Sequence, residues 1–146
     1  MEFSMKILIM GLPGSGKTTL AVELAKRLSA VHWNADDVRQ NINKDLKFTM
    51  ADRIEQARRM GWLCDQVNKA GYPAIADFVC PTKETRSAFA PSHVIFMDTI
   101  KSGRYEDTNN IFEAPLSTEY MYKFTNFNSK LQAEIIANAI KYHSSI

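Results

Sequence analysis

The sequence predicts an α/β fold in which a doubly wound parallel sheet of about five strands is flanked by helices. Strand-like apolar segments alternate with helix-like segments, and a phosphate-binding motif joins the first such pair. The 146 residues suffice for one domain but not for two independent cores. We therefore expect residues 1–146 to form a single domain that binds its ligands at the carboxyl ends of the strands.

The first strand and helix frame the most informative motif of the chain. Residues 7–10 are typical of a buried parallel strand, and residues 18–29 place leucines on one helical face. Between them, residues 11–18 match the pattern G-x-x-x-x-G-K-[ST], which surrounds phosphate oxygens with backbone N–H groups at a helix N-terminus. A complete motif in this setting predicts a P-loop NTPase fold and disfavours a glycine-rich turn with no ligand.

The remaining elements are expected in the same alternating order. Residues 31–34 are typical of a second strand, and the acidic Asp36 and Asp37 suit a helix start. Residues 49–52 resemble a capping box for a long helix that continues to about Ala70. In the second half of the chain we expect a strand over 73–79, a short helix after Pro81 and a strand over 92–97. A polar irregular stretch over 99–118 should follow, and after it a strand over 120–125 and a helix from Ser129.

Composition narrows the classes of partner. A net charge of +2 argues against binding to nucleic acid through overall charge. The two cysteines, Cys64 and Cys80, have no metal-binding or C-x-x-C spacing, so we expect reduced thiols in a cytoplasmic protein. No apolar run approaches the length of a membrane span, and the N-terminus lacks the apolar region of a signal peptide. We therefore expect a soluble protein with no membrane partner.

The motif also assigns roles in nucleotide binding. Lys17 is expected to contact the β- and γ-phosphates of ATP and is a candidate catalytic residue. The Thr18 hydroxyl is expected to hold Mg²⁺, so ATP and Mg²⁺ are the expected cofactors. The expected nucleotide-binding set is Gly11, Leu12, Pro13, Gly14, Ser15, Gly16, Lys17, Thr18 and Thr19.

Beyond the P-loop, Asn34-Ala-Asp-Asp-Val-Arg39 is followed by Phe48 and by a charged segment over residues 52–59. This ordered set resembles the adenylylsulfate kinase family, which phosphorylates the 3′-hydroxyl of adenosine 5′-phosphosulfate. Family members typically contain D-G-D-N-V-R, G-F, D-R-x-E-N-x-R-R, I-S-P followed by an arginine, and finally F-T-G with P-Y-E-x-P. The resemblance implies a single P-loop kinase domain linked to sulfate assimilation, and because the family is commonly dimeric, a homodimer is among the expectations. The similar segments here are residues 34–39, 47–48, 52–59, 79–81 with Arg86, and 105–107 with 111–115.

The resemblance implies an acceptor site as well. Asp36 can accept the proton of the acceptor hydroxyl or bind Mg²⁺ through water, with helix capping as the alternative. Arg39 and Arg53 can present planar guanidinium groups to the phosphosulfate. Phe48 and Tyr105 resemble the aromatic pair that sandwiches the acceptor adenine, with core packing as the alternative. The whole expected acceptor set is Asp36, Arg39, Phe48, Arg53, Gln56, Val79, Cys80 and Tyr105.

Several positions depart from the family pattern and leave the acceptor open. Asn34 and Ala35 stand where the family has Asp and Gly, Gln56 replaces an Asn, and Cys80 replaces the Ser of I-S-P. Two alternatives therefore remain. One is a P-loop kinase for another small hydroxyl compound or a nucleic-acid 5′-end, and the other is a nucleotide-binding regulatory protein with little turnover.

Two more departures concern the nucleotide side. Asp77 places a charge in the apolar third strand, where it either binds Mg²⁺ like a Walker-B aspartate or pairs with a nearby arginine. Between Asp98 and Tyr105 a short loop stands where the family has a longer lid containing R-D-x-K-G-L-Y. Its basic residues, Lys101 and Arg104, either replace part of the lost contacts or are solvated loop charges.

Overall fold

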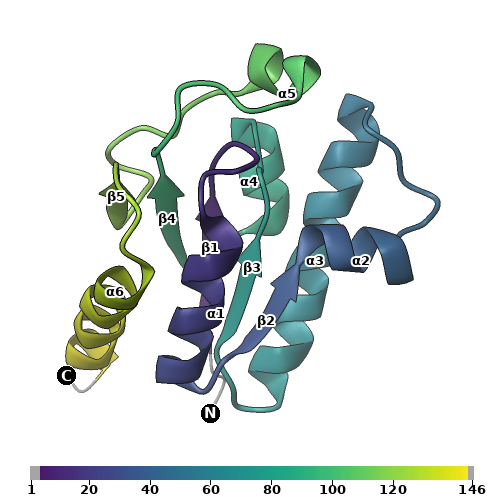
Figure 1. Ribbon diagram of the computed structural model, residues 1–146. Coiled ribbons are helices and arrows are strands. Elements are labelled where there is room, and N and C mark those ends of the chain that lie inside the picture. Colours follow the sequence, from purple (N-terminus) through teal and green to yellow (C-terminus); the bar gives the residue numbers. More distant parts are fainter. Residues whose placement is uncertain (1–3, 145–146) are drawn as a thin grey trace.

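The computed structural model describes residues 4–144, in which helices and strands alternate along the chain as predicted (Figure 1). The elements are β1 (Lys6–Met10), α1 (Lys17–Leu28), β2 (Val31–Asn34), α2 (Ala35–Asn41), α3 (Met50–Lys69), β3 (Ala74–Asp77), α4 (Lys83–Phe89), β4 (His93–Met97), α5 (Glu106–Ile111), β5 (Tyr122–Phe124) and α6 (Ser129–Ser144).

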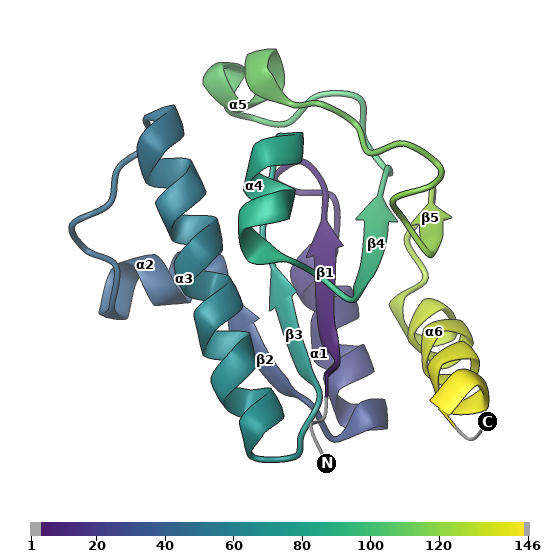
Figure 2. The same ribbon diagram turned by 180° about the vertical axis from the view of Figure 1, so that it is seen from behind.

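The strands form one five-stranded sheet in the order β2-β3-β1-β4-β5, and each neighbouring pair is parallel. Helices α1 and α6 lie on one face of this sheet, and α3 and α4 lie on the other (Figures 1 and 2). The predicted doubly wound sheet of about five strands is therefore confirmed. Because β1 lies at the centre, the loop that follows it emerges in the middle of the carboxyl edge of the sheet.

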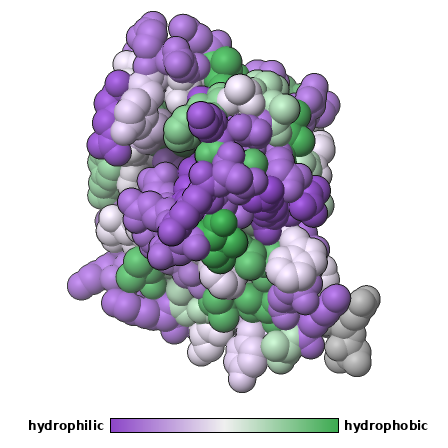
Figure 3. Space-filling model, turned by 90° about the vertical axis from the view of Figure 1, so that its right-hand side faces the viewer, coloured by the Kyte–Doolittle hydropathy of each residue, from purple (hydrophilic) through white to green (hydrophobic). Residues whose placement is uncertain are grey.

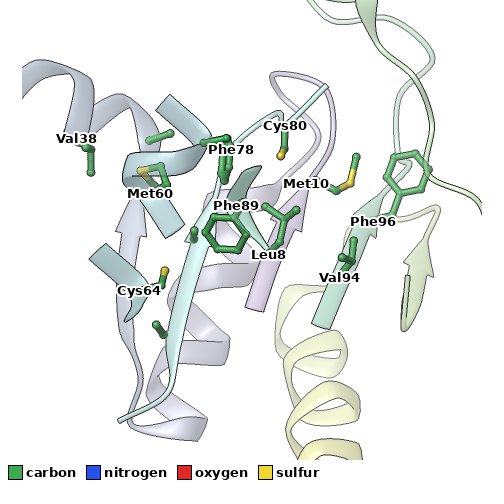
Figure 4. Close-up of a cluster of buried hydrophobic side chains, with 14 residues drawn as sticks. Leu8, Met10, Val38, Met60, Cys64, Phe78, Cys80, Phe89, Val94 and Phe96 are labelled. Atoms are coloured by element: carbon green, nitrogen blue, oxygen red, sulfur yellow. The ribbon is translucent and has the colours of Figure 1, made fainter. Parts of the chain in front are cut away.

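Strand β1 is buried along its whole length because helices cover both faces of the sheet. Successive side chains point to opposite faces, so Leu8 and Met10 join the hydrophobic cluster beneath α3 and α4, which Figure 4 shows. Ile7 and Ile9 join the second cluster, beneath α1 and α6. The two clusters hold the sheet between its helices and fix the position of the loop after β1.

Local sequence explains where the helices begin and how closely they pack. The Thr49 side chain accepts a hydrogen bond from the backbone N–H of Asp52, which confirms the predicted start of α3. Further along α3, a Cβ added at Gly61 would lie 2.6 Å from the Phe89 carbonyl oxygen. Glycine at this position therefore lets α3 approach the end of α4 closely.

The structure differs from the expected elements in the second half of the chain. The stretch 99–118, expected to be irregular, contains the short helix α5, which buries Thr108 and has no apolar stripe that sequence periodicity could reveal. The third strand ends at Asp77 rather than at residue 79. Cys80, just beyond, has a φ of 47°, a left-handed conformation that does not continue a strand.

The surface on the side of α2 and α3 is hydrophilic over much of its upper half, and hydrophobic residues appear near its centre and across its lower half (Figure 3). Across residues 4–144, none of the helices combines the length and the apolar character needed to cross a membrane.

Candidate active site

A cavity of about 1340 Å³ lies at the carboxyl edge of the sheet, where the P-loop emerges. Small-molecule sites are usually about 300–1,000 Å³, so this cavity has room for two ligands side by side. The lining comes from residues 13–19 without Ser15, residues 34–36 with 39 and 40, Phe48, Arg53, Gln56, residues 77–81, Met97, residues 104–108 without 106, and residues 127–132 without 131. The site therefore combines the ends of several strands, as expected for a doubly wound sheet.

The P-loop has the backbone that its glycines predict. Gly14 and Gly16 have φ values of 87° and 95°, a left-handed region that disfavours other residues. Gly11, Leu12 and Ser15 lie behind the cavity wall. The other predicted nucleotide-binding residues line the cavity: Pro13, Gly14, Gly16, Lys17, Thr18 and Thr19.

Lys17 is buried at the start of α1, and its Nζ donates a hydrogen bond of 3.0 Å to the Leu12 carbonyl oxygen. Burial lowers the pKa of Lys17 to about 8, against the nearby carboxylates of Asp77 and Asp36, which raise it. The ammonium group is thus close to both carboxylates within the cavity. It has the position and charge to meet phosphate oxygens.

Asp77 ends β3 and is only 2% exposed, so its charge needs partners. Its Oδ1 accepts hydrogen bonds from the Thr18 hydroxyl at 2.9 Å and from Asn34 Nδ2 at 3.1 Å. Its Oδ2 pairs with Nε2 of His32. Within residues 4–144 no arginine pairs with Asp77, and His32 on the neighbouring strand takes the place expected for one.

The donor atoms of Thr18 and Asp77 fit a magnesium ion. Both are oxygen donors, and Mg²⁺ in phosphate sites is usually held by one or two protein groups together with phosphates and water. No group of three or more His, Cys, Asp or Glu side chains in the described part of the chain could hold a metal by itself. These two residues would therefore share an ion with a bound nucleotide.

Asp36 stands on the first turn of α2, exposed to the cavity. The capping residue of this helix is Asn34, whose side-chain oxygen accepts the backbone N–H of Asp37 at 3.0 Å. Asn34 rather than Asp36 therefore caps the helix, and capping no longer explains why an acidic residue stands at position 36. The charge of Asp36 raises the pKa of both Lys17 and Arg39, and all three side chains line the same cavity.

Phe48 forms a cluster with two arginines beside the cavity. It is 66% exposed, which rules out core packing. The guanidinium carbons of Arg39 and Arg53 lie 4.5 Å and 5.5 Å from its ring centroid, within range of cation–π attraction. Arg39 also donates to the Lys47 carbonyl at 2.9 Å, and Arg53 donates to the Phe48 carbonyl at 3.0 Å. The sequence-predicted arginine pair and aromatic are thus brought together.

Tyr105, the second predicted aromatic, also lines the cavity and is 56% exposed. The guanidinium carbon of Arg104 lies 5.3 Å from its ring centroid. Phe48 and Tyr105 thus offer two exposed aromatic rings to the same cavity, a surface suited to a flat heterocycle.

Gln56, Val79 and Cys80 line the cavity as well. Gln56 is buried and donates to the Ala35 carbonyl at 3.3 Å, so it also holds the start of α2. Burial raises the pKa of Cys80 to about 12, which keeps its thiol neutral. Arg86 donates to the Cys80 carbonyl at 3.1 Å, and this contact does not depend on the side chain that replaces the family's serine.

Sequence reasoning missed several residues of the site. His32 and Asn34 lie on β2 with nothing in the local sequence to show that both reach Asp77. Phe127 was missed too, although it lies so close to the P-loop that a Cβ at Gly16 would be 3.0 Å from its ring. Phe127 and Asn128 lie between β5 and α6, and they line the cavity together with Ser129, Lys130 and Gln132 of the first turn of α6.

The sequence comparisons with known proteins point to one family. The family model described as adenylylsulphate kinase matches residues 3–112. Adenylyl-sulfate kinase 3 of Arabidopsis thaliana is 38% identical over 85 residues, which are 55% of this chain and 41% of the plant protein. The adenylyl-sulfate kinase of Clostridium kluyveri is 40% identical over 81 residues, which are 52% of this chain and 41% of that protein. The matched stretch thus spans less than half the length of either relative.

Solved structures share the fold at lower identity. The structure of the Mycobacterium tuberculosis APS kinase CysC in complex with AMPPNP and APS has a TM-score of 0.83 and 18% identity, covering 97% of this chain and 99% of that one. Shikimate kinase from Aquifex aeolicus has a TM-score of 0.62 and 14% identity, covering 96% and 98%. These likenesses show a shared P-loop kinase fold. Because the family model matches about three quarters of its residues, this chain belongs to the adenylylsulphate kinase family.

Proposed function

We propose that this protein transfers the γ-phosphoryl group of Mg-ATP to the 3′-hydroxyl of adenosine 5′-phosphosulfate, forming 3′-phosphoadenosine 5′-phosphosulfate. The observation that supports this most strongly is that one cavity is lined by the P-loop, by Asp36 and by the arginine–aromatic cluster of Arg39, Phe48 and Arg53. The adenylyl-sulfate kinases among its relatives point to the same reaction.

On the donor side, the backbone N–H groups of the P-loop and the N-terminus of α1 would surround the phosphates. Lys17 would leave the Leu12 carbonyl for the β- and γ-phosphate oxygens, where its charge is better matched. Thr18 and Asp77 would hold Mg²⁺, which neutralises phosphate charge when bound. Phe127, beside Gly16, offers a ring against which the base of the nucleotide could stack.

On the acceptor side, Phe48 and Tyr105 would hold the adenine, and Arg39 and Arg53 would bind the phosphosulfate. Aromatic rings suit the flat adenine base, and guanidinium groups suit the divalent phosphosulfate anion. Gln56, Val79 and Cys80 would form the wall beside the acceptor, with the Cys80 backbone fixed by Arg86. The substitution of serine by cysteine therefore leaves the wall in place.

For the transfer itself, Asp36 is the catalytic carboxylate. It lies near Lys17 and near Arg39, which is where an acceptor hydroxyl would meet the γ-phosphate. The carboxylate can accept the proton of that hydroxyl as the new phosphorus–oxygen bond forms and the bond to the leaving ADP breaks. We expect direct in-line transfer between the two substrates, with no covalent enzyme intermediate.

A panel of acceptors tests this function. ADP formation is measured with Mg-ATP alone and with adenosine 5′-phosphosulfate, shikimate, a hexose or a 5′-hydroxyl oligonucleotide, and product is identified by mass spectrometry. Selective stimulation by adenosine 5′-phosphosulfate supports the proposal. Selective stimulation by another acceptor replaces it with another kinase, and nucleotide binding without turnover replaces it with a regulatory protein.

We further propose that the protein works in the cytoplasm as an oligomer, with a homodimer as the expected state. The fold relative described as a hexameric APS kinase from Thiobacillus denitrificans, with a TM-score of 0.76 and 22% identity, supports association in general. Sedimentation of the purified protein with and without nucleotide measures its state directly.

A further inference from the structure

The short loop after β4 is packed onto the P-loop at three points. The Thr99 hydroxyl donates a hydrogen bond of 2.8 Å to the Ser15 carbonyl oxygen. Ile100 lies against the next part of the P-loop, because a Cβ at Gly14 would be 3.9 Å from its Cδ1. In Figure 1 this connection from β4 to α5 passes beside the purple loop that joins β1 to α1.

The third point of contact is Gly103. A Cβ at this position would lie 3.1 Å from Cδ and 3.3 Å from the carbonyl oxygen of Pro13, so the glycine backbone is pressed against the P-loop. The Asn109 side chain of α5 also receives the N–H of Gly103 at 2.8 Å and donates to its carbonyl at 2.9 Å. Gly103 is thus held between the P-loop and α5, which fixes the residue that follows it.

That next residue is Arg104, and it lines the cavity. Its guanidinium lies over the ring of Tyr105, and its charge is near enough to contribute to the lowered pKa of Lys17. Among residues 4–144 no carboxylate forms an ion pair with Arg104, and the same holds for Arg39 and Arg53, the other two arginines that line the cavity. Lys101 of the same loop is exposed and lies outside the cavity lining.

We propose that Arg104 is a catalytic residue that contacts the transferring phosphoryl group, and that the loop docked on the P-loop holds it there without a mobile lid. This inference rests on the proposed kinase function. During transfer the bond from the γ-phosphorus to the β,γ-bridging oxygen breaks, the bond to the acceptor oxygen forms, and the hydroxyl proton goes to Asp36. The planar guanidinium would donate to the γ-phosphoryl oxygens, where charge must be stabilised in the transition state.

The kinetic test compares Arg104→Ala and Arg104→Lys with Lys101→Ala as the matched control in the same loop. Removing a donor aimed at the transition state lowers kcat on the order of 100-fold, so we expect that loss in Arg104→Ala with a much smaller change in KM for ATP. Arg104→Lys should recover part of the rate, and Lys101→Ala should keep it. Equal kcat in Arg104→Ala and the unaltered protein would overturn the proposal.

A binding test separates this inference from the choice of acceptor. Affinity is measured by calorimetry for Mg-ADP and for Mg-ADP with aluminium fluoride, which mimics a phosphoryl group in transfer. We expect Arg104→Ala to lose affinity at least tenfold for the fluoride complex while keeping its affinity for Mg-ADP. An unchanged ratio of the two affinities overturns the role of Arg104, whether or not adenosine 5′-phosphosulfate is the acceptor.

The docked loop has a test of its own. Gly103→Ala introduces a methyl group against Pro13 and should displace the loop, so it should lose affinity for the fluoride complex in the same way as Arg104→Ala. Thr99→Val, which removes the hydroxyl bound to Ser15, should show the same loss to a smaller degree. If both variants bind the fluoride complex as tightly as the unaltered protein, the docking contacts do not position Arg104.

Discussion

The imidazole of His32 pairs with the buried carboxylate of Asp77 across the neighbouring strands β2 and β3. The other carboxylate oxygen of Asp77 accepts the hydroxyl of Thr18, the P-loop residue expected to hold Mg²⁺. A side chain on the edge strand of the sheet is thereby linked through Asp77 to the nucleotide site.

This link predicts a loss of stability in His32→Ala. The substitution leaves the buried Asp77 carboxylate without its Nε2 partner, and an unsatisfied buried group costs about 1–3 kcal/mol. The free energy of unfolding in urea measures the loss. His32→Gln, which can still donate a hydrogen bond, is the matched control and should lose less. Equal stability of His32→Ala and the unaltered protein would show that the pair contributes nothing.

Lys17→Ala is expected to abolish phosphoryl transfer while the fold survives. The ammonium meets a carbonyl oxygen in the structure and makes no ion pair in the described residues, so its loss removes charge from the phosphate site more than packing from the core. We expect the rate to fall by several orders of magnitude. Steady-state kinetics and circular dichroism on the same sample check this, and near-normal turnover in a folded Lys17→Ala protein would refute the kinase assignment.

Asp36→Asn should lower kcat far more than the affinity for Mg-ATP. Because Asn34 caps α2, the substitution should leave thermal stability nearly unchanged. Asn34→Ala, which removes both the cap and a hydrogen bond to the buried Asp77, is the contrasting variant and should lower stability by at least about 1 kcal/mol. A stability loss in Asp36→Asn without a loss of rate would mean that Asp36 serves the helix and not the reaction.

Arg39→Ala and Arg53→Ala should weaken acceptor binding while leaving Mg-ATP binding intact. A hydrogen bond to a charged group contributes about 1.5–3 kcal/mol, so each variant should lose roughly one to two orders of magnitude in acceptor affinity. Calorimetry with each ligand separately measures this. Equal losses for acceptor and nucleotide in both variants would contradict the division of the cavity into two sides. Arg58→Ala, an exposed arginine on α3 outside the cavity, is the control.

Glu55 should contribute to the pH dependence of the protein's stability. Hydrogen bonds from Arg58 and Arg59 lower the pKa of Glu55 from 4.5 to about 2. A lowered pKa in the folded state stabilises the fold above pH 4.5, and this contribution disappears as the pH falls from 4.5 towards 2. The stability difference between the unaltered protein and Glu55→Gln should therefore shrink over that range. Salt should reduce the difference at neutral pH because the group is exposed; a pH-independent difference would contradict the assignment.

Sequence reasoning reached the sheet and the P-loop because both follow from local patterns. Parallel strands covered on both faces are uniformly apolar. The glycines of residues 11–18 indicate a backbone with positive φ angles, and the structure has that backbone. It also selected Arg39, Phe48 and Arg53 before their contact was known, through a resemblance of ordered motifs. The strand pattern, the P-loop motif and each family-like motif can all be recognised within a few neighbouring residues.

The missed features depend on contacts between distant parts of the chain. His32 and Asp77 are 45 residues apart, and only the pairing of β2 with β3 brings them together. The helix α5 has no apolar periodicity, because its place is set by the docking of Gly103 and Asn109 rather than by burial of a stripe. Phe127 approaches Gly16 for a similar reason, since β5 pairs with β4 at the edge of the sheet.

The carbonyl of Cys80 is held by Arg86, whose guanidinium in turn pairs with Glu119 at 3.1 Å. Glu119 lies beyond residue 112, where the family match ends. A fragment cut at that boundary would retain all the predicted acceptor residues from Asp36 to Tyr105, and yet Arg86, which holds the Cys80 carbonyl, would lose its carboxylate partner. Residues 113–144 therefore help to build the cavity in which we propose that transfer takes place, although the family model ends before them.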